Sequence, residues 1–379
     1  MGREIVHEES PKKPGNRSRL WKNEDVLHTL KDDNGTAAVQ GIFLDLSKIK
    51  DVQLSSQVFE KIYLPHELRY LRWDSYPLEA LPSSFNPVNL VELNLSYSSI
   101  EQLWEGTKLI QSLPDESEFE LYVDGGGSMK FIFVNCLKFN LKAVSDIFGE
   151  SLLKLQVMAI ENVSSLFKDI PFRGICDIPL GQHGKEVKVS ICLLGSEIPE
   201  WFYYQNSGSS INIPRLQHDC GSSRYIMGFA LCLVIGFEEC YFLPHDALTI
   251  HYDFHIENSD GHKEEVFHDS FPLFSWETSL SIDLDHIFLG YVFSLKYYDD
   301  FFQKLDALPT NRGMSDYLGT SIEFNLLRHC SPLHPEACKV KHCGIYPIYV
   351  KVDSVEELKN IAINQDTGET SGSNDSQAR

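Results

Sequence analysis

Cysteine and histidine alternate at every fourth position near the end of the sequence, at Cys330, His334, Cys338 and His342. A helix would place residues at this spacing on one face, where thiolate and imidazole groups could bind zinc. Pro332 and Pro335 argue against that helix, because proline breaks a helix interior. No Cys-x-x-Cys pair accompanies the set. We therefore favour a loop followed by a strand over a metal site.

A second group of ionisable residues alternates along one short run, at His251, Asp253 and His255. A strand would place all three on the same face, where they could form a metal site or an acid/base pair. The solvated outer face of a half-buried strand explains the same alternation, and we favour that interpretation.

Three serines lie in two glycine-containing segments, Gly195-Ser196-Glu197 and Gly208-Ser209-Ser210. Neither segment has the Gly-x-Ser-x-Gly pattern that exposes a nucleophilic serine at a strand-to-helix turn. We interpret both as turns. The sequence therefore predicts no catalytic residue, no cofactor site and no metal site.

The elements that would carry these residues follow a sequence repeat in the N-terminal part of the chain. Leu68-x-x-Leu71-x-Trp73 recurs as Leu90-x-x-Leu93-x-Leu95, offset by 22 residues, and Leu78 and Leu81 recur as Ile100 and Leu103. This period is typical of leucine-rich repeats, whose leucines point inward while the intervening residues face outward on a concave sheet. The outward positions are the first candidates for binding a partner: Tyr70, Arg72, Asp74, Glu92, Asn94 and Ser96.

The repeat array looks short. Val39-x-x-Ile42-x-Leu44 resembles an irregular first repeat, 29 residues before the next, whereas the pattern fails near residue 112. At least three stacked repeats are usually needed to close a core, so the array needs capping neighbours.

Beyond Gly125-Gly126-Gly127 the spacing of apolar residues changes. Apolar spacing between residues 137 and 167 predicts one or two helices. Short alternating runs then follow, separated by turn residues, which favours an antiparallel β-sandwich. The expected strands are 187–193, 210–213, 228–237, 247–256, 286–295 and 321–326.

The predicted fold class is α+β multidomain: a short leucine-rich-repeat solenoid followed by an antiparallel β-sandwich of jelly-roll or Ig-like type. The predicted units are 1–35, the remnant of a preceding region; 36–113, the repeats; 114–171, a linker and helical segment; 172–352, the sandwich; and 353–379, a disordered acidic tail.

The composition argues against two classes of partner, nucleic acids and membranes. With 33 Lys+Arg against 54 Asp+Glu, the net charge of −21 repels phosphate, so no nucleic-acid partner is expected. The longest uncharged apolar run, 225–237, has 13 residues, fewer than the roughly 20 that a membrane span needs. Nine scattered cysteines and the absence of an apolar leader indicate a reducing, intracellular compartment.

Several stretches resemble a known family, the plant TIR-NB-LRR disease-resistance receptors. Met1–Val6 and Glu9–Trp21 are similar to the end of its nucleotide-binding region, and Gly35–Ser47 and Leu68–Leu93 to its first repeats. Cys192–Phe202, Ser207–Ile211 and Val340–Ile345 resemble its jelly-roll/Ig-like domain after the repeats, the C-JID domain.

The resemblance implies an interaction module of innate immunity that binds a pathogen effector, or other domains or copies of the receptor, in the cytoplasm, with the nucleus as an alternative. It adds Glu197, Trp201 and Ser209 to the partner-binding candidates. The family's NAD-hydrolysing TIR domain and phosphate loop are missing, so no enzyme activity is expected. Two alternatives remain: a truncated decoy or regulatory partner of full-length receptors, and a metal-binding hydrolase. The sequence leaves the oligomeric state open.

Overall fold

The computed structural model describes residues 2–31, 37–48, 64–82, 85, 89–103, 127–139, 187–214, 224–244, 246–258, 261–275, 279–293, 317–328 and 337–351. Strands dominate these residues and helices are few. None of the helices among them is long and apolar enough to cross a membrane. The helical segment expected between 137 and 167 and the acidic tail fall almost wholly outside the described ranges.

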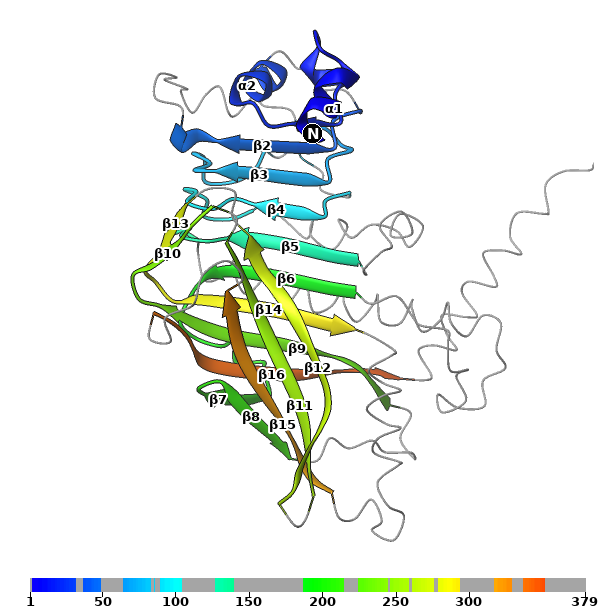
Figure 1. Cartoon of the computed structure of the whole chain (residues 1–379), viewed down its shortest axis with the longest axis vertical. Coiled ribbons are helices and arrows are strands. Elements are labelled where there is room, and N and C mark those ends of the chain that lie inside the picture. The colour runs from blue at the N-terminus through cyan, green and yellow to red at the C-terminus, as the bar shows by residue number, and fades with distance from the viewer. Residues whose placement is uncertain are drawn as a thin grey trace, which may run out of the picture.

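The N-terminal elements lie at the first edge of a large sheet, of which β1 is the first strand (Figure 1). They are α1 (Gly2–Glu9), η1 (Pro14–Asn16), β1 (Arg19–Leu20) and α2 (Asn23–Lys31). The buried Arg17 joins them, because its guanidinium pairs with Asp25 at 2.7 Å and donates to the carbonyls of Ser10 and Pro11.

Four parallel strands follow in chain order: β2 (Gly41–Asp45), β3 (Tyr70–Asp74), β4 (Glu92–Asn94) and β5 (Gly127–Phe133); η2 (Leu46–Lys48) follows β2. Leu71 pairs with Ile42 on one side and Leu93 on the other, and Leu93 pairs with Phe131. The predicted offsets of 29 and 22 residues are confirmed by this register, which aligns the inward positions of successive turns.

Each of the last three turns leaves its strand in the same way. Ser75, Tyr97 and Asn135 have positive φ values of 62°, 60° and 56° at equivalent positions. The next residues, Tyr76, Ser98 and Cys136, are buried below the strands. Ser98 Oγ accepts a hydrogen bond from the Tyr76 amide at 2.9 Å, and Cys136 Sγ donates to the Leu95 carbonyl at 3.0 Å. These bonds join each turn to its neighbour.

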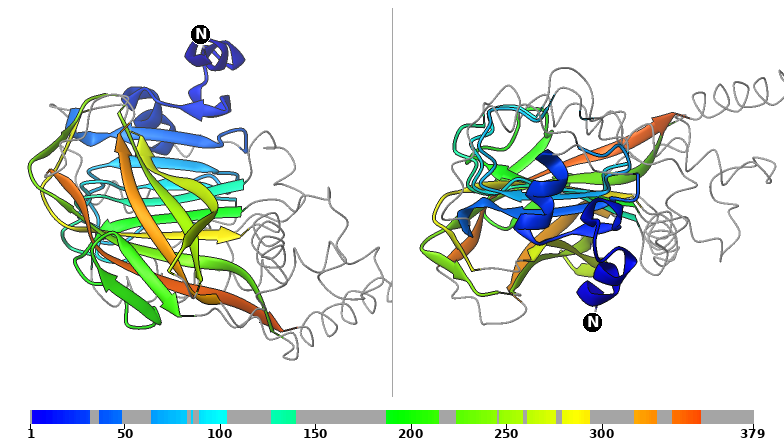
Figure 2. Two further views of the ribbon diagram at one scale, coloured as in Figure 1. Left: turned by 60° about the horizontal axis from the view of Figure 1, so that its bottom comes forward. Right: turned by 90° about the horizontal axis from the view of Figure 1, so that it is seen from above.

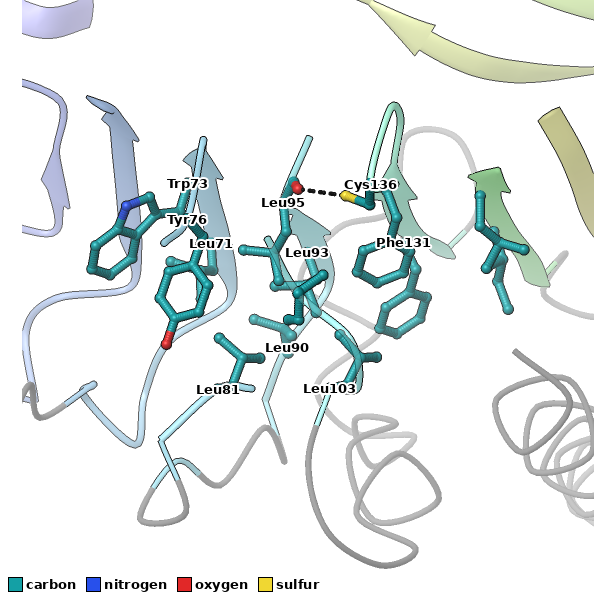
Figure 3. Packing of buried hydrophobic residues seen from close by; sticks show 14 of the residues in the cluster. Leu71, Trp73, Tyr76, Leu81, Leu90, Leu93, Leu95, Leu103, Phe131 and Cys136 are labelled. Atoms are coloured by element: carbon teal, nitrogen blue, oxygen red, sulfur yellow. Dashed lines mark hydrogen bonds between the residues drawn. The ribbon is translucent and has the colours of Figure 1, made fainter. Parts of the chain in front are cut away.

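Strand β5 extends the row of parallel strands by one that the sequence did not predict. It lies within the range 114–171, expected to be a linker and helices. Phenylalanines 131 and 133 occupy the inward positions that leucine fills in β4, and Cys136 lies where the repeat consensus has asparagine or cysteine. Figure 3 shows Phe131 and Cys136 stacked beside Leu93 and Leu95.

The sheet then continues without a break into the C-terminal region. Strand β6 (Val187–Leu194) pairs parallel with β5, and the antiparallel strands β14 (His286–Phe293), β9 (Arg224–Phe237), β16 (Cys338–Lys351) and β7 (Tyr204–Ser207) complete a ten-stranded sheet (Figure 1). All six expected C-terminal strands overlap observed ones. The sheet as a whole is mixed rather than antiparallel, because its N-terminal half is the parallel array.

A second, four-stranded sheet lies against one face of the first (Figure 2). Its order is β12 (Lys263–Ser275), β11 (Ala247–Asn258), β15 (Tyr317–Arg328) and β8 (Ser210–Pro214). Gly290 on β14 permits the approach, since a Cβ there would lie 2.9 Å from the Phe271 ring. A short ribbon, β10 (Cys240–Phe242) with β13 (Leu280–Ile282), lies beside the end of β4.

Two hydrophobic cores lie on opposite faces of the ten-stranded sheet. Along β5, Phe131 and Phe133 join the first core, which runs from Leu20 to Ile348. The alternate residues, Ile132 and Val134, join the core shared with the four-stranded sheet. The outward-facing residues of β3 and β4 therefore lie on the same face of the ten-stranded sheet that the four-stranded sheet covers in the C-terminal region.

Candidate protein-binding surface

The six predicted outward residues lie together on and just after β3 and β4. Tyr70 pairs with Glu92 and Arg72 pairs with Asn94, so they form adjacent rows across the sheet. Arg72 donates to Asp74 Oδ2 through Nε at 3.1 Å and through Nη2 at 2.9 Å. This places a charged pair on the open face, beside the half-buried Tyr70 and Glu92.

Facing outward does not leave all six residues in contact with solvent. Asp74, Asn94 and Ser96 are buried, with 8%, 2% and 1% of their surface exposed. Asn94 Oδ1 accepts two hydrogen bonds from Ser96, from the amide at 3.1 Å and from Oγ at 2.7 Å. Because these polar groups satisfy one another, they can lie out of water. Only Tyr70, Arg72 and Glu92 keep partial exposure for a partner.

Residues that the sequence did not predict connect this face to the ribbon. The Tyr97 hydroxyl and the Asn135 side-chain amide each donate to the Ser281 carbonyl on β13, both at 2.9 Å. The pKa of Tyr97 is raised, chiefly by burial of its hydroxyl, with Asp74 and Asp283 acting in the same direction. The ribbon is therefore fixed to the last two turns of the repeats.

A buried histidine also takes part in this contact region, which we call the joint and which consists of Tyr97, Asn135, Ser281 and His286. The amide of Asn135 donates to His286 Nε2 at 3.1 Å, while His286 Nδ1 lies 2.8 Å from the Leu284 carbonyl. Nδ1 must carry the proton for both bonds to form, so the ring is neutral. Burial lowers the pKa of His286 to about 4, although the Leu284 bond and Asp285 act in the opposite direction. The imidazole stays uncharged at neutral pH.

Exposed apolar side chains lie at this joint and at the two ends of the ribbon. Tyr97, Tyr241, Leu243 and Leu284 are among the large hydrophobic residues that remain exposed in the described part of the chain. Tyr241 lies opposite Ser281 in the ribbon, and Leu243 and Leu284 follow its two strands. No sequence signal could group them, because the ribbon pairs strands far apart in the chain. Aromatic and aliphatic side chains beside charged ones are typical of protein-binding surfaces.

The other three predicted residues lie elsewhere. Glu197 and Trp201 lie between β6 and β7, and Ser209 precedes β8, near the end of the sheet opposite the repeats. Trp201 is half-buried, stacked on Phe202 at 4.0 Å and edge-on to Tyr346 at 5.6 Å. Glu197 and Ser209 are exposed. The structure does not bring these residues together with the repeat face.

The metal candidates do not form a metal site among the described residues. On β16, Cys338 is buried in the core while His342 is exposed, which fits the favoured strand and not a helix with one ligand face; Cys330 and His334 lie outside the described residues. On β11, His251, Asp253 and His255 lie half-buried on the outer face, with Asn325 donating to Asp253 at 3.5 Å. Among the described ranges, no three His, Cys, Asp or Glu residues are grouped to hold a metal ion.

Comparison with known proteins matches residues 193–353 to the C-JID domain and residues 89–108 to a leucine rich repeat. Disease resistance protein RPP2A of Arabidopsis thaliana is 44% identical over 139 residues, which cover 30% of this chain and 10% of that protein. RPP2B of the same plant is 36% identical over 143 residues (30% and 12%), and RPV1 of Vitis rotundifolia 35% over 159 residues (30% and 11%).

These relatives confirm the predicted resemblance to plant TIR-NB-LRR disease-resistance proteins. The chain spans about a tenth of the length of the curated relatives it matches.

Proposed function

We propose that this chain is part of a plant innate immune receptor and that it recognises a pathogen effector protein without catalysing a reaction. The relatives support the immune role, since they are disease resistance proteins matched over C-JID and repeat sequence. The exposed apolar side chains at the ribbon joint, beside the Arg72–Asp74 pair, carry the binding role. The chain acts in the cytoplasm, with the nucleus as an alternative.

The proposal includes the architecture. The turns from β2 to β5 form a short leucine-rich-repeat solenoid, and the C-terminal sheets form the jelly-roll/Ig-like sandwich of the C-JID domain. Shared hydrophobic cores and the register of the parallel strands support both assignments. Loops and ribbons held on such a scaffold present binding residues at low entropic cost.

The chemistry of the joint indicates how the effector would bind. Tyr97 and Tyr241 offer large, rigid contact surfaces that lose little conformational entropy, as is common at interface hot spots. Arg72 and Glu92 form a charged margin that favours a partner with the complementary pattern. Ser281, fixed by Tyr97 and Asn135, holds the ribbon in place before the partner arrives.

The test begins with a panel of secreted effectors of plant pathogens, screened by co-precipitation with the full chain. The effector that binds is then titrated against Tyr241→Ala and Glu92→Lys. We expect Tyr241→Ala to weaken binding about tenfold or more, a loss of roughly 1.4 kcal/mol.

Tyr203→Ala is the matched control, because Tyr203 is 80% exposed and lies near the opposite end of the sheet. Undiminished affinity in both joint variants, or loss only in the control, contradicts the assigned surface. Failure of the folded chain to retain any effector of the panel contradicts effector recognition itself.

A further inference from the structure

Two cysteines from distant parts of the chain meet where the ribbon begins. Cys240 opens β10, and Cys338 opens β16, paired with Phe237 at the end of β9. The turn between β9 and β10 has Glu239 at a φ of 51° and folds around one peptide group of the β16 segment. The Ala337 carbonyl accepts from the Glu238 amide at 2.8 Å and from Cys240 Sγ at 3.1 Å.

Cys338 directly follows Ala337, so the two thiols lie next to each other, and each shifts the pKa of the other. The hydrogen bonds of two other described cysteines go to backbone carbonyls. Cys136 donates to the Leu95 carbonyl and Cys343 to the Ser210 carbonyl. Cys232 and Cys343 are near each other in the β9–β16 ladder, but they belong to cores on opposite faces of the sheet.

The surroundings make the two thiols unequal. The neighbouring thiol of Cys338, acting as a hydrogen-bond donor, lowers the pKa of Cys240; burial opposes this, and the guanidinium of Arg328 lowers it further. Arg328 is fixed there by its ion pair with Asp246 and by its bond to the Tyr241 carbonyl at 2.9 Å. The pKa of Cys338 is raised, first because its proton is donated to Cys240. Cys240 is therefore the better nucleophile of the pair.

We propose that Cys240 and Cys338 form a reversible disulfide when the protein meets hydrogen peroxide. The sulfur of Cys240 attacks one peroxide oxygen, so an S–O bond forms, the O–O bond breaks, and the departing hydroxide leaves as water with the Cys240 proton. Cys338 sulfur then attacks the sulfenic sulfur; the S–S bond forms, the S–O bond breaks, and a second water carries away the Cys338 proton. Two thiols and one peroxide give one disulfide and two waters.

Access to the buried pair is through the ribbon. Both cysteines are largely shielded from solvent. The strands β10 and β13, however, have three residues each, and Tyr241, the middle residue of β10, is exposed. So short a ribbon opens locally at a small fraction of the global unfolding free energy, which admits a molecule as small as peroxide.

The disulfide would bind the ribbon to β16 covalently. The ribbon carries Ser281, which accepts the bonds from Tyr97 and Asn135. Oxidation would therefore lock the joint between the repeats and the C-terminal sheets, and reduction would release it.

The test uses the full chain, reduced, exposed to graded hydrogen peroxide, quenched with N-ethylmaleimide and digested without reductant. Mass spectrometry should find the 240 and 338 peptides joined, lighter than their sum by two hydrogen atoms, and separated again by dithiothreitol. Cys240→Ala and Cys338→Ala should abolish this species, whereas Cys343→Ala, the control on the same strand, should retain it. Independent alkylation of both cysteines, at peroxide levels that oxidise other cysteines of the chain, overturns the proposal.

A second readout needs no digestion. The peroxide-treated wild type and Cys343→Ala should unfold at a temperature several degrees higher than their reduced forms, because the cross-link restricts the unfolded chain. Cys240→Ala should show no such rise. An equal rise in Cys240→Ala would assign the effect to another thiol and contradict the pair.

Discussion

At the scale of single residues, His286 shows how burial can convert an ionisable group into a structural one. Its two ring nitrogens join Asn135 of the last repeat turn to Leu284 of the ribbon segment. The sequence predicted a strand starting at this histidine but gave no sign of the bonds, because both partners are set by tertiary contacts. The bonds require a neutral ring, so the joint depends on pH.

Acidification should weaken the fold through His286. The unfolded residue binds a proton below about pH 6.5, whereas the folded residue does so only below about pH 4. The unfolded state therefore holds more protons between these values, and the unfolding free energy falls as the pH drops through that window, by up to about 3 kcal/mol. Urea titrations at pH 7 and pH 4.5 measure this loss.

His286→Gln should show a smaller loss over the same window, because glutamine does not titrate. His268→Gln, at an exposed histidine, is the control and should behave as the wild type. Neither substitution alters the neighbouring Asp285, whose carboxylate is held by Lys341 at 2.8 Å. An identical pH dependence in His286→Gln would refute this role for the imidazole.

Gly344 packs the segment Val340–Ile345 against the segment Cys192–Phe202, two stretches that the sequence showed only separately. It lies on β16, and a Cβ there would be 2.9 Å from Ile198 Cγ2 and 3.3 Å from Phe202 Cβ. Gly344→Ala should therefore lower the unfolding free energy by about 1–3 kcal/mol, measured by urea denaturation. His342→Ala, exposed on the same strand, should change it by less than about 0.5 kcal/mol. Equal stability of the two variants would show that the contact relaxes freely.

At the scale of elements, the periodicity of apolar residues predicted many of the strands but missed β5. The 22-residue offset was enough to align β3 with β4, because leucines at fixed intervals must stack. Strand β5 was missed because phenylalanine replaces leucine there and the spacing to it is longer. Alternation likewise predicted the C-terminal strands, but no local pattern states which strand pairs with which.

Leucine should be tolerated at position 131 of β5, because leucine occupies the paired position 93 of β4. Phe131 is buried in the first core against Leu93, so Phe131→Ala should lower the unfolding free energy by about 3–5 kcal/mol. Phe131→Leu should cost only about 1 kcal/mol, because leucine fills the same position in β4. Thermal unfolding followed by circular dichroism compares the two. Equal losses would mean that β5 does not pack as a repeat turn.

At the scale of the whole molecule, the repeats and the C-terminal region share one sheet and one continuous core. The first core includes Leu71 from the repeats and Cys232 from β9. The sequence predicted the two regions from their different periodicities, and the same difference suggested separate units. It could not predict the parallel β5–β6 pair, because that contact joins segments more than fifty residues apart in the chain.

The two regions should therefore unfold together. Hydrogen exchange of the backbone amides should give β3 and β9 the same opening free energy, within about 1 kcal/mol, because no boundary in the core separates them. Mass spectrometry of exchanged, digested protein measures both strands in one sample. A repeat segment that exchanges at much lower free energy than β9 would show two independent units.

The parallel seam between β5 and β6 also bears on how such chains change length. Each turn added before β4 would present the same row of backbone donors and acceptors to β4 that β3 presents now. Whole turns inserted or deleted before β4 would therefore leave the closing strand, the histidine contact and the bond from Tyr97 to the ribbon as they are. Gene rearrangements that remove multiples of one turn would leave a molecule that still closes at its far end.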